Sequence, residues 1–179
     1  MSVNLDSDIK YCPYCQTALE YRELAGRTRP WCPSCKTGFF ADPKLAVAVV
    51  IEYGERIVLQ RRTIDPGAGL WTFPSGFVDR GEPVEEAAIR EAWEEVGVYV
   101  RLTRLLGLYS SSGETVVLVV YVAEAESGRL ESRDENDAVG LFSPDELPQL
   151  AFPNDDAIIE TWLRGGSAPV KNPVLDDLN

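Results

Sequence analysis

The stretch Gly76–Val98, GFVDRGEPVEEAAIREAWEEVGV, predicts both a fold and a site for this chain. It has the pattern of a glycine-containing loop followed by an amphipathic helix. Pro83 suits the first helical turn, where its missing N–H costs nothing. Gly97 suits the end of the helix, where the backbone turns left-handed. The expected core-facing stripe consists of Ile89, Ala92, Trp93 and Val96.

Three glutamates share another face of this predicted helix. At about 100° per residue, Glu94 and Glu95 lie within roughly 60° of Glu91, and Arg90 flanks them. Like charges at this spacing destabilise a helix by a few tenths of a kcal/mol per pair. A hard divalent cation with oxygen ligands would offset that cost. A solvated acidic face without a ligand is the alternative interpretation of these residues alone.

The loop before the helix favours the metal-binding interpretation, because loop and helix together form one long motif. Its fixed positions are Gly76, Glu82, Arg90, Glu91, Glu94, Glu95 and Gly97. In this register the segment resembles the Nudix box of the Nudix hydrolase family at every fixed position. The resemblance implies an α/β/α sandwich with a mixed sheet. It also implies hydrolysis of a nucleoside diphosphate linked to another moiety, X.

Carried over position by position, the resemblance implies a role for each side chain around Mg²⁺ or Mn²⁺. Glu94 and Glu95 are expected to be the primary metal ligands. Glu91 is expected to be a further ligand or the general base for the attacking water. Arg90 would orient the glutamates, and Glu82 would be an outer ligand or an anchor.

Residues outside the helix complete the predicted site. Many relatives carry the general base on a later loop, so Glu114 and Glu135 are candidates, with plain surface acids as the alternative. Arg61 and Arg62 are candidate phosphate contacts. Only one of the two should face the site, because successive strand side chains point to opposite faces. Gly76 is expected to allow close approach of the backbone.

The N-terminal part contains all four cysteines of the chain, in the pattern C-x2-C-x16-C-x2-C. This spacing predicts a tetrahedral zinc site, with redox pairs or disulfides as alternatives. A site with four thiolates has no open position for chemistry, so the zinc would be structural and the module a zinc ribbon. The predicted ligands are Cys12, Cys15, Cys32 and Cys35.

Composition and charge restrict the possible functions. The net charge is −12 and there is no histidine, so acid–base chemistry would use carboxylates, Tyr, Lys or water. An acidic chain is a poor candidate for non-specific nucleic-acid binding, although residues 10–44 hold six Lys/Arg against three Asp/Glu. No apolar run approaches the about 20 residues of a membrane span, and the first residues lack a secretory signal. We expect a cytoplasmic homodimer.

Four parts are expected along the chain, and strand–helix alternation predicts an α/β class for the largest. They are a flexible N-terminus (1–10), the zinc ribbon (11–41), a Nudix domain (42–164) and a tail (165–179). The expected strands are Leu45–Tyr53, Arg56–Arg62, Val98–Tyr109, Thr115–Glu124 and Val139–Phe142. A polar excursion is expected at Glu126–Asp137 and a last helix at Asp155–Leu163.

The ribbon-plus-box layout resembles dinucleotide diphosphatases. NADH-cleaving members carry SQPWPFP after the box, whereas Gly107–Gly113 here is GLYSSSG, which argues against NADH. RRTIDPGAGLWTFPSGFVDRGE, Arg61–Glu82, resembles FAD and ADP-ribose diphosphatases. We therefore expect Mg²⁺-dependent cleavage of ADP-ribose or FAD to AMP and a second phosphorylated product. The alternatives are a nucleotide-sensing regulator whose ribbon binds nucleic acid or protein, and a hydrolase that releases pyrophosphate from modified triphosphates.

Overall fold

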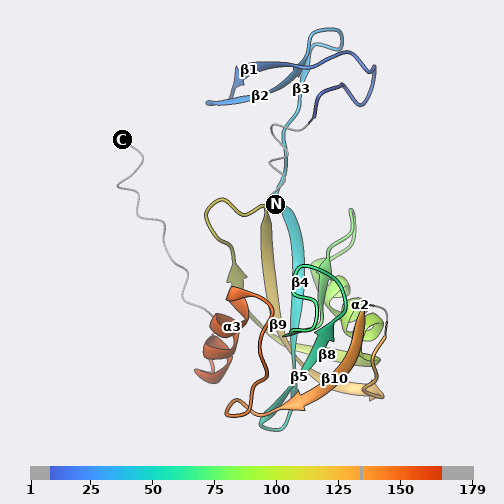
Figure 1. Cartoon of the computed structure of the whole chain (residues 1–179), viewed down its shortest axis with the longest axis vertical. Coiled ribbons are helices and arrows are strands. Elements are labelled where there is room, and N and C mark those ends of the chain that lie inside the picture. The colour runs from blue at the N-terminus through green and yellow to red at the C-terminus, as the bar shows by residue number, and fades with distance from the viewer. Residues whose placement is uncertain (1–8, 134, 167–179) are drawn as a thin grey trace. The chain divides into compact units, whose positions relative to one another are not determined.

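The computed structural model describes residues 9–133 and 135–166, and the chain divides into two compact units (Figure 1). The first unit holds the described residues up to 44 together with 113–115, and the second holds 45–112 and the described residues from 116. The flexible N-terminus predicted at 1–10 and the tail predicted at 165–179 lie outside the described residues, except for 9–10 and 165–166.

The first unit is a three-stranded antiparallel sheet in the order β1 (Glu20–Leu24), β2 (Arg27–Cys32) and β3 (Thr37–Gly38). Ala25 and Gly26 connect β1 to β2, both with positive φ (50° and 73°). This is the left-handed two-residue turn that matches the twist of a hairpin. Gln16 and Lys36, each directly after a Cys-x2-Cys pair, also have positive φ (59° and 54°). The two cysteine turns therefore have related backbone shapes.

The second unit is built on a seven-stranded sheet. Its main path runs β10 (Asn136–Phe142), β5 (Arg56–Arg62), β4 (Lys44–Tyr53), β9 (Val116–Gly128) and β8 (Val98–Tyr109). Two short strands join it, β6 (Trp71–Thr72) on β5 and β7 (Ser75–Phe77) on β4. Strand β7 places the start of the Nudix-like loop on a central strand.

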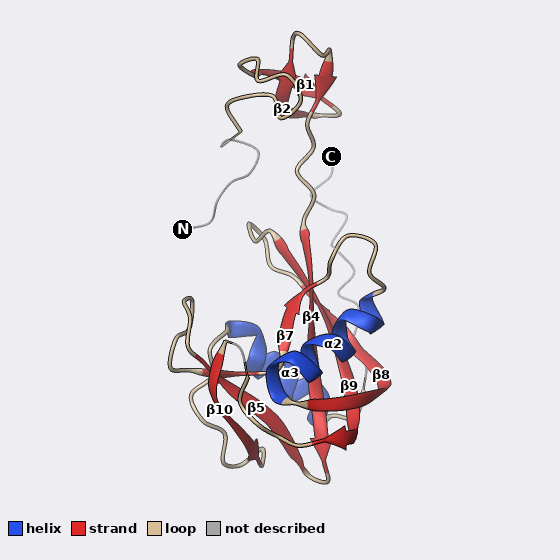
Figure 2. Ribbon diagram, turned by 90° about the vertical axis from the view of Figure 1, so that its right-hand side faces the viewer, coloured by secondary structure: helices blue, strands red, loops and turns tan. Residues whose placement is uncertain are grey.

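Helices α2 (Val84–Val96) and α3 (Pro153–Leu163) cover opposite faces of this sheet (Figures 1 and 2). Alternate residues of β4 show why: Val47 and Val49 pack with the α2 side, whereas Ala48 and Val50 pack with the α3 side. The apolar run of β4 is buried on both faces, as its continuous hydrophobicity predicts. The predicted α/β/α sandwich with a mixed sheet is confirmed. Neither α2 nor α3 has the length and apolar character that crossing a bilayer requires.

Two details of α2 differ from the expectation. Pro83 lies one position before the helix as its N-cap, with extended backbone, and its carbonyl accepts the first helical hydrogen bond from Ala87 (3.0 Å). Trp93 is outside the hydrophobic core: it stacks on Tyr99 (centroids 4.2 Å apart), and the Arg133 guanidinium lies 4.2 Å from its ring. The small side chains Ala87, Ala88 and Ala92 fill the core side instead.

The predicted polar excursion at Glu126–Asp137 is wrong at both of its ends. Strand β9 continues to Gly128, and β10 begins at Asn136. The acidic end of β9 stays paired with β8 as far as Gly128, opposite Val98, and Arg101 of β8 also pairs with Glu124 (2.5 Å) and Glu126 (3.5 Å) across the ladder. Opposite charges on neighbouring strands stabilise such pairing.

Candidate active site

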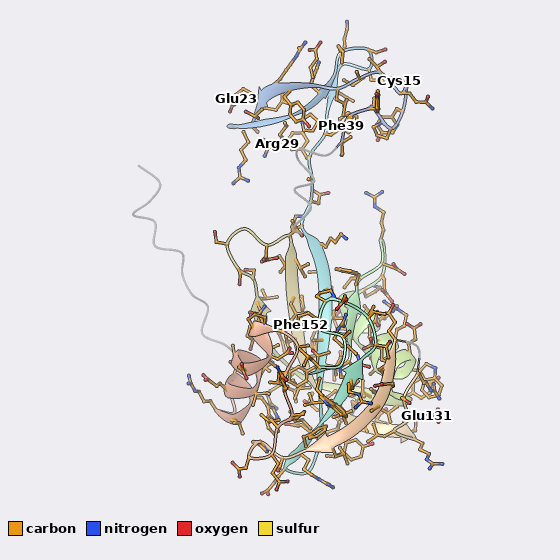
Figure 3. All side chains as sticks on the ribbon, viewed as in Figure 1. Cys15, Glu23, Arg29, Phe39, Glu131 and Phe152 are labelled. Atoms are coloured by element: carbon orange, nitrogen blue, oxygen red, sulfur yellow. The ribbon has the colours of Figure 1, made fainter. Side chains whose placement is uncertain are left out.

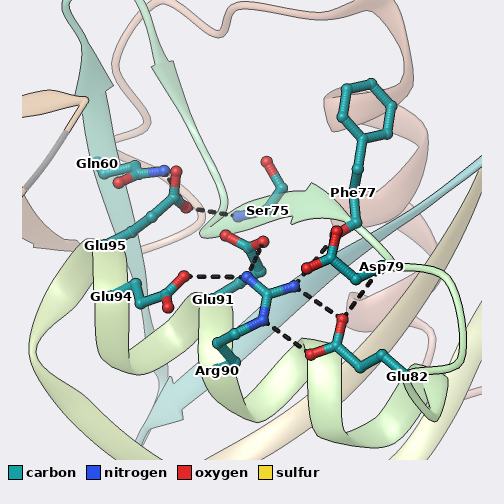
Figure 4. Close-up of polar contacts among 9 residues, drawn as sticks. All are labelled: Gln60, Ser75, Phe77, Asp79, Glu82, Arg90, Glu91, Glu94 and Glu95. Carbon is teal, nitrogen blue, oxygen red and sulfur yellow. Dashed lines mark hydrogen bonds and ion pairs between the residues drawn. The ribbon is translucent and has the colours of Figure 1, made fainter.

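Arg90 is the centre of the polar cluster on α2 (Figure 4). Its Nε and Nη2 donate to the two carboxylate oxygens of Glu82 at 2.8 and 3.0 Å, a bidentate pair. Its Nη1 donates to Glu91 Oε1 (2.6 Å) and Glu94 Oε2 (2.9 Å). Its Nη2 also donates to the carbonyl of Phe77, on β7 (3.1 Å). One guanidinium thus holds three carboxylates and the incoming loop together.

Glu82 anchors the loop that precedes the helix. Its Oε2 accepts a hydrogen bond from the backbone N–H of Asp79 (3.0 Å), and its own N–H donates to the Asp79 carbonyl (3.0 Å). The hydrogen bonds from Arg90 lower the pKa of Glu82 to about 2. Glu82 is therefore a carboxylate at every physiological pH, and its two oxygens are already occupied by donors.

Glu95 is buried to the same extent as Glu91, each being 8% exposed. Its Oε2 accepts from the Ser75 backbone N–H (2.6 Å) and from Gln60 Nε2 (2.5 Å). Burial raises its pKa to about 8, since the desolvation of the charged form outweighs these two donors. A cation beside Glu95 would favour the ionised form, so this acid is suited to a site that acquires positive charge.

Glu91 lies under the loop, against Gly76. A Cβ at position 76 would collide with the Glu91 carboxylate, so any other residue there would require the end of the Glu91 side chain to move. Burial raises the pKa of Glu91, and the adjacent Arg90 opposes that shift. The predicted close approach of the backbone at Gly76 is therefore an approach to a helix carboxylate.

The donor set of α2 fits a hard divalent cation. Glu91 and Glu94 each give one oxygen to Arg90, Glu95 gives one to Ser75 and Gln60, and the other oxygen of each remains for a metal. In the part of the chain that the structure describes, however, only the cysteines form a group of ligand atoms within 4.8 Å of one another. Arg90 sits between the glutamates, so a cation would bind by turning Glu94, whose side chain is 45% exposed.

The two candidate phosphate-binding arginines face different ways. Val58, Gln60 and Arg62 alternate along the α2 side of β5, and the charge of Arg62 lowers the pKa of Glu95. Arg61 instead forms a bidentate ion pair with Asp137 (2.7 and 3.1 Å) and lies over Trp71. Arg62 is also engaged, because its Nε donates to the Pro66 carbonyl (2.9 Å) and its guanidinium lies over Phe152 (5.1 Å). Its position on the α2 side of β5 is what makes it the phosphate-binding candidate of the pair.

The two candidate bases outside the box belong to different units of the chain. Glu114 belongs to the first unit, with residues 113–115. Glu135 uses its carbonyl to accept from the N–H (3.0 Å) and the hydroxyl (2.7 Å) of Thr63. The catalytic assignments of both residues stay predictions.

Several contributors to the cluster were not predicted from the sequence. They are backbone groups of Ser75, Phe77 and Asp79 and the side chains of Gln60 and Asn136. Asn136 Nδ2 donates to Gln60 Oε1 (2.7 Å) and to the Glu95 carbonyl (2.7 Å), and both amides are buried. Only Gln60 could have been suspected from the sequence, because it is a single amide at the end of an apolar strand segment, IVLQ. Asn136 gave no such signal, since its partners lie 76 and 41 residues away.

The four cysteines of the first unit form a second cluster, of which Cys15 is labelled in Figure 3. The Cys12–Cys35 and Cys15–Cys32 sulfur atoms are 3.9 and 3.5 Å apart. Thiolates at 2.3 Å from a shared tetrahedral zinc would be about 3.8 Å apart, whereas disulfide sulfurs are about 2.05 Å apart. The cysteines are free, and the geometry fits a tetrahedral metal better than either alternative pairing.

Comparison with known proteins agrees with this geometry. A family model described as the NUDIX domain matches residues 42–163. The chain is 35% identical over 133 residues to an ADP-ribose pyrophosphatase of Methanocaldococcus jannaschii, covering 72% of this chain and 78% of that one. It superimposes with a TM-score of 0.81 on a NUDIX hydrolase from Nitrosomonas europaea, at 28% identity, covering 89% and 96% of the two chains.

A second group of relatives consists of NAD-capped RNA hydrolases. The chain is 30% identical over 145 residues to NudC of Chromobacterium violaceum, covering 80% of this chain and 54% of that one. It thus spans about half the length of these relatives. Together the fold, the box and these matches define a Nudix hydrolase. The chain belongs to that family, as its sequence motif predicts.

Proposed function

We propose that this Nudix hydrolase cleaves the diphosphate linkage of ADP-ribose or FAD, with Mg²⁺, to AMP and a second phosphorylated product. The observation that carries the proposal is the cluster of Glu91, Glu94 and Glu95, each with one oxygen directed to protein donors and one remaining. The M. jannaschii relative named ADP-ribose pyrophosphatase supports the choice of substrate.

Each side chain has a defined part in this reaction. Glu91, Glu94 and Glu95 would hold Mg²⁺, which neutralises phosphate charge and acidifies water when bound. Arg90 keeps the glutamates oriented through its contacts of 2.6–2.9 Å to Glu91 and Glu94. Arg62, on the same side of β5 as Gln60, would contact a phosphate oxygen. A water oxygen adds to one phosphorus, the bridging P–O bond breaks, and two phosphate monoesters leave.

The test is a product assay on the intact chain. ADP-ribose, FAD and NADH are each incubated with the protein and Mg²⁺, and AMP is measured by chromatography. We expect AMP from ADP-ribose or FAD, no release in excess EDTA, and less from NADH. Binding of these nucleotides without AMP release would favour the sensing regulator. Release of pyrophosphate from a modified triphosphate would favour a hydrolase of modified triphosphates.

Zinc in the cysteine cluster is part of the same proposal. The hydrogen bond with Thr17 lowers the pKa of Cys15 to about 6, whereas the hydrogen bond with Cys15 raises the pKa of Cys35 to about 12. The four thiols share protons in this way, and a bound cation would favour the thiolate form of all four. The first unit has little core beyond Cys12, Cys32 and the residues around Trp31, so a metal would supply much of its stability. Elemental analysis should give one zinc per chain.

A second candidate function is cleavage of a dinucleotide at the end of an RNA. The register of β1 and β2 puts Arg22 opposite Arg29 and Leu24 opposite Arg27, so three arginines share one face of the ribbon. Arg22 lies over Trp31 (5.1 Å) on that face, although it also pairs with Glu20 (2.9 Å). Arginine beside aromatic rings suits single-stranded nucleic acid.

Fluorescence anisotropy with a labelled single-stranded RNA decides whether the ribbon contributes. We expect binding that weakens with salt and is reduced at least tenfold in Arg22→Glu/Arg27→Glu. Arg101→Glu, a charge reversal on β8, is the matched control. Equal affinities for the two variants would remove this candidate and leave the free dinucleotide as substrate.

A homodimer is also proposed. Leu105 and Leu108 are 47% and 64% exposed on β8, which is the end strand of the sheet path. An exposed apolar edge strand is a surface for pairing with a second copy. Light scattering of the wild type and Leu108→Lys tests this: the variant should be monomeric. The cytoplasmic location stays a prediction.

A further inference from the structure

Behind the Glu95 carboxylate lies a buried chain of two amides. Gln60 is 2% exposed and Asn136 is 7% exposed. Asn136 Nδ2 donates to Gln60 Oε1, and Gln60 Nε2 donates to Glu95 Oε2 (Figure 4 shows the Gln60 end). The chain joins β10 and β5 to the last turn of α2, over 76 and 35 residues of sequence.

The direction of these hydrogen bonds is fixed by Asn136. Its Nδ2 has two acceptors, the Glu95 carbonyl and Gln60 Oε1, so its amide cannot be reversed without placing acceptors together. Gln60 Oε1 is thereby occupied, and the NH₂ group of Gln60 must face Glu95. With the Ser75 N–H on the same oxygen, Oε2 receives two donors and Oε1 is left for a cation.

A β-bulge in β10 orients the Asn136 side chain towards Gln60 and Glu95. The register of β10 shifts between Asn136, opposite Arg62, and Ala138, opposite Arg61, so Asp137 is the extra residue. Arg61 clamps Asp137 through two hydrogen bonds (2.7 and 3.1 Å). Thr63 clamps the Glu135 carbonyl on the other side. Bulges commonly re-aim a side chain beside an active site, and here both neighbours of Asn136 are held.

One further observation separates this pair from ordinary core packing. Asn136 Oδ1 is buried with no hydrogen-bond partner among the described residues. An apolar side chain would avoid that cost at a purely structural position. The amide of Asn136 instead donates hydrogen bonds through its two N–H groups to the Glu95 carbonyl and to Gln60.

We propose that Gln60 and Asn136 are positioning residues: they fix the Glu95 carboxylate so that Oε1 faces the cation. This rests on the proposed function, because it requires a metal at α2. Both side chains are buried, so neither is available for contact with the substrate. Their loss should therefore weaken metal binding and lower kcat while the KM for the dinucleotide stays the same.

The experiment measures Mn²⁺ binding by electron paramagnetic resonance, without substrate, in Gln60→Met and Asn136→Leu. Both variants keep side-chain volume and remove the donors. We expect Mn²⁺ affinity to fall 10–100-fold, the range found for residues that orient metal ligands. Tyr121→Phe is the matched control, because it removes a hydrogen bond to Glu85, an α2 glutamate outside the cluster (3.0 Å). Its Mn²⁺ affinity should equal that of the wild type.

The outcomes separate the two proposals. Wild-type Mn²⁺ affinity in folded Gln60→Met and Asn136→Leu overturns the positioning role and leaves the proposed function standing. A wild-type protein that binds no Mn²⁺ and cleaves no dinucleotide overturns both. If Asn136→Leu loses its cooperative thermal transition, Asn136→Ser replaces it under the same criterion. A lower affinity with an unchanged KM supports the inference.

Discussion

The two ligand clusters of this chain are assembled in opposite ways. The four cysteine sulfurs already lie within 4.8 Å of one another, on turns of a unit with a three-stranded sheet. The glutamates stand on a 13-residue helix packed in a large core, and Arg90 occupies the position between Glu91 and Glu94 by pairing with both. The ligand atoms of the cysteine cluster already lie close together, but little core supports the unit that carries them. The helix that carries the glutamates is held by a large core, but its carboxylate oxygens are not yet grouped around a cation position.

Because of this difference, a cation would have a different effect on the protein at each cluster. A metal at the cysteines would replace a missing core, since a unit of this size has too little apolar surface to fold alone. A cation at α2 would find a helix held by other contacts and would displace part of an existing ion-pair network. The first would be needed for folding, and the second for reaction only.

The largest expected effect is on turnover. Glu95→Gln should lower kcat by about 10³-fold, because metal stabilisation of phosphate charge is worth several kcal/mol. The fold should remain, since Gln can accept the Ser75 and Gln60 hydrogen bonds. Steady-state kinetics and circular dichroism measure the two quantities. A variant with near-normal kcat would disprove the ligand assignment.

The opposite response is expected at the cysteines. Cys32→Ser should lose the zinc and the structure of the first unit, while the thermal transition of the second unit remains. Elemental analysis and two-dimensional NMR would follow the two units separately. Zinc-free protein with a fully folded first unit would contradict the comparison, because the sulfur cluster would then be only a packing feature.

Asp155 is a third buried acid of this chain, outside both ligand clusters. It accepts from the Phe152 N–H (3.1 Å) and the Thr72 hydroxyl (3.3 Å), and burial raises its pKa from 3.8 to about 6. The folded state binds the proton more tightly than the unfolded state. The contribution of Asp155 to the free energy of unfolding is therefore largest below pH 4. It falls by on the order of 3 kcal/mol as the pH rises through 6.

Asp155→Asn should remove this part of the pH dependence. Urea unfolding at pH 4 and pH 7.5 gives the change in free energy for variant and wild type. We expect the variant to lose less stability than the wild type between the two values. Parallel curves would show that Asp155 titrates normally in the folded protein.

A smaller effect is expected at the loop that covers Glu91. Gly76→Ala should cost about 1–3 kcal/mol of stability, as overpacking does, because its Cβ collides with the Glu91 carboxylate. Gly166→Ala is the control, since a Cβ there meets no atom within 4 Å. Chemical denaturation measures both, and equal midpoints would show that the loop moves freely away from the helix.

The smallest effect should separate the two arginines. Arg62→Ala should raise the KM for the dinucleotide several-fold by losing one phosphate contact, about 1 kcal/mol. Arg61→Ala should leave KM unchanged, because Arg61 lies on the other side of β5, where it pairs with Asp137. Kinetics of the two variants side by side give the answer. A reversed order would mean that the faces of β5 are assigned wrongly.

Local patterns determined much of this protein. Residues on one helix share a face because of a fixed angle per residue, so the grouping of Glu91, Glu94 and Glu95 followed from spacing alone. The cysteine pairs and the buried strand β4 were readable for the same reason: their signals lie within a few residues. The family followed from the same local motif.

The way in which these groups are held depends on long-range packing. It moved Trp93 out of the core, turned Arg61 towards Asp137, and brought Gln60 and Asn136 behind Glu95. Each of these outcomes depends on contacts between residues 35 to 76 positions apart in the sequence, or on competition for space between side chains. Spacing along the chain carries no information about such contacts, because sheet register and packing fix them only when the whole unit folds.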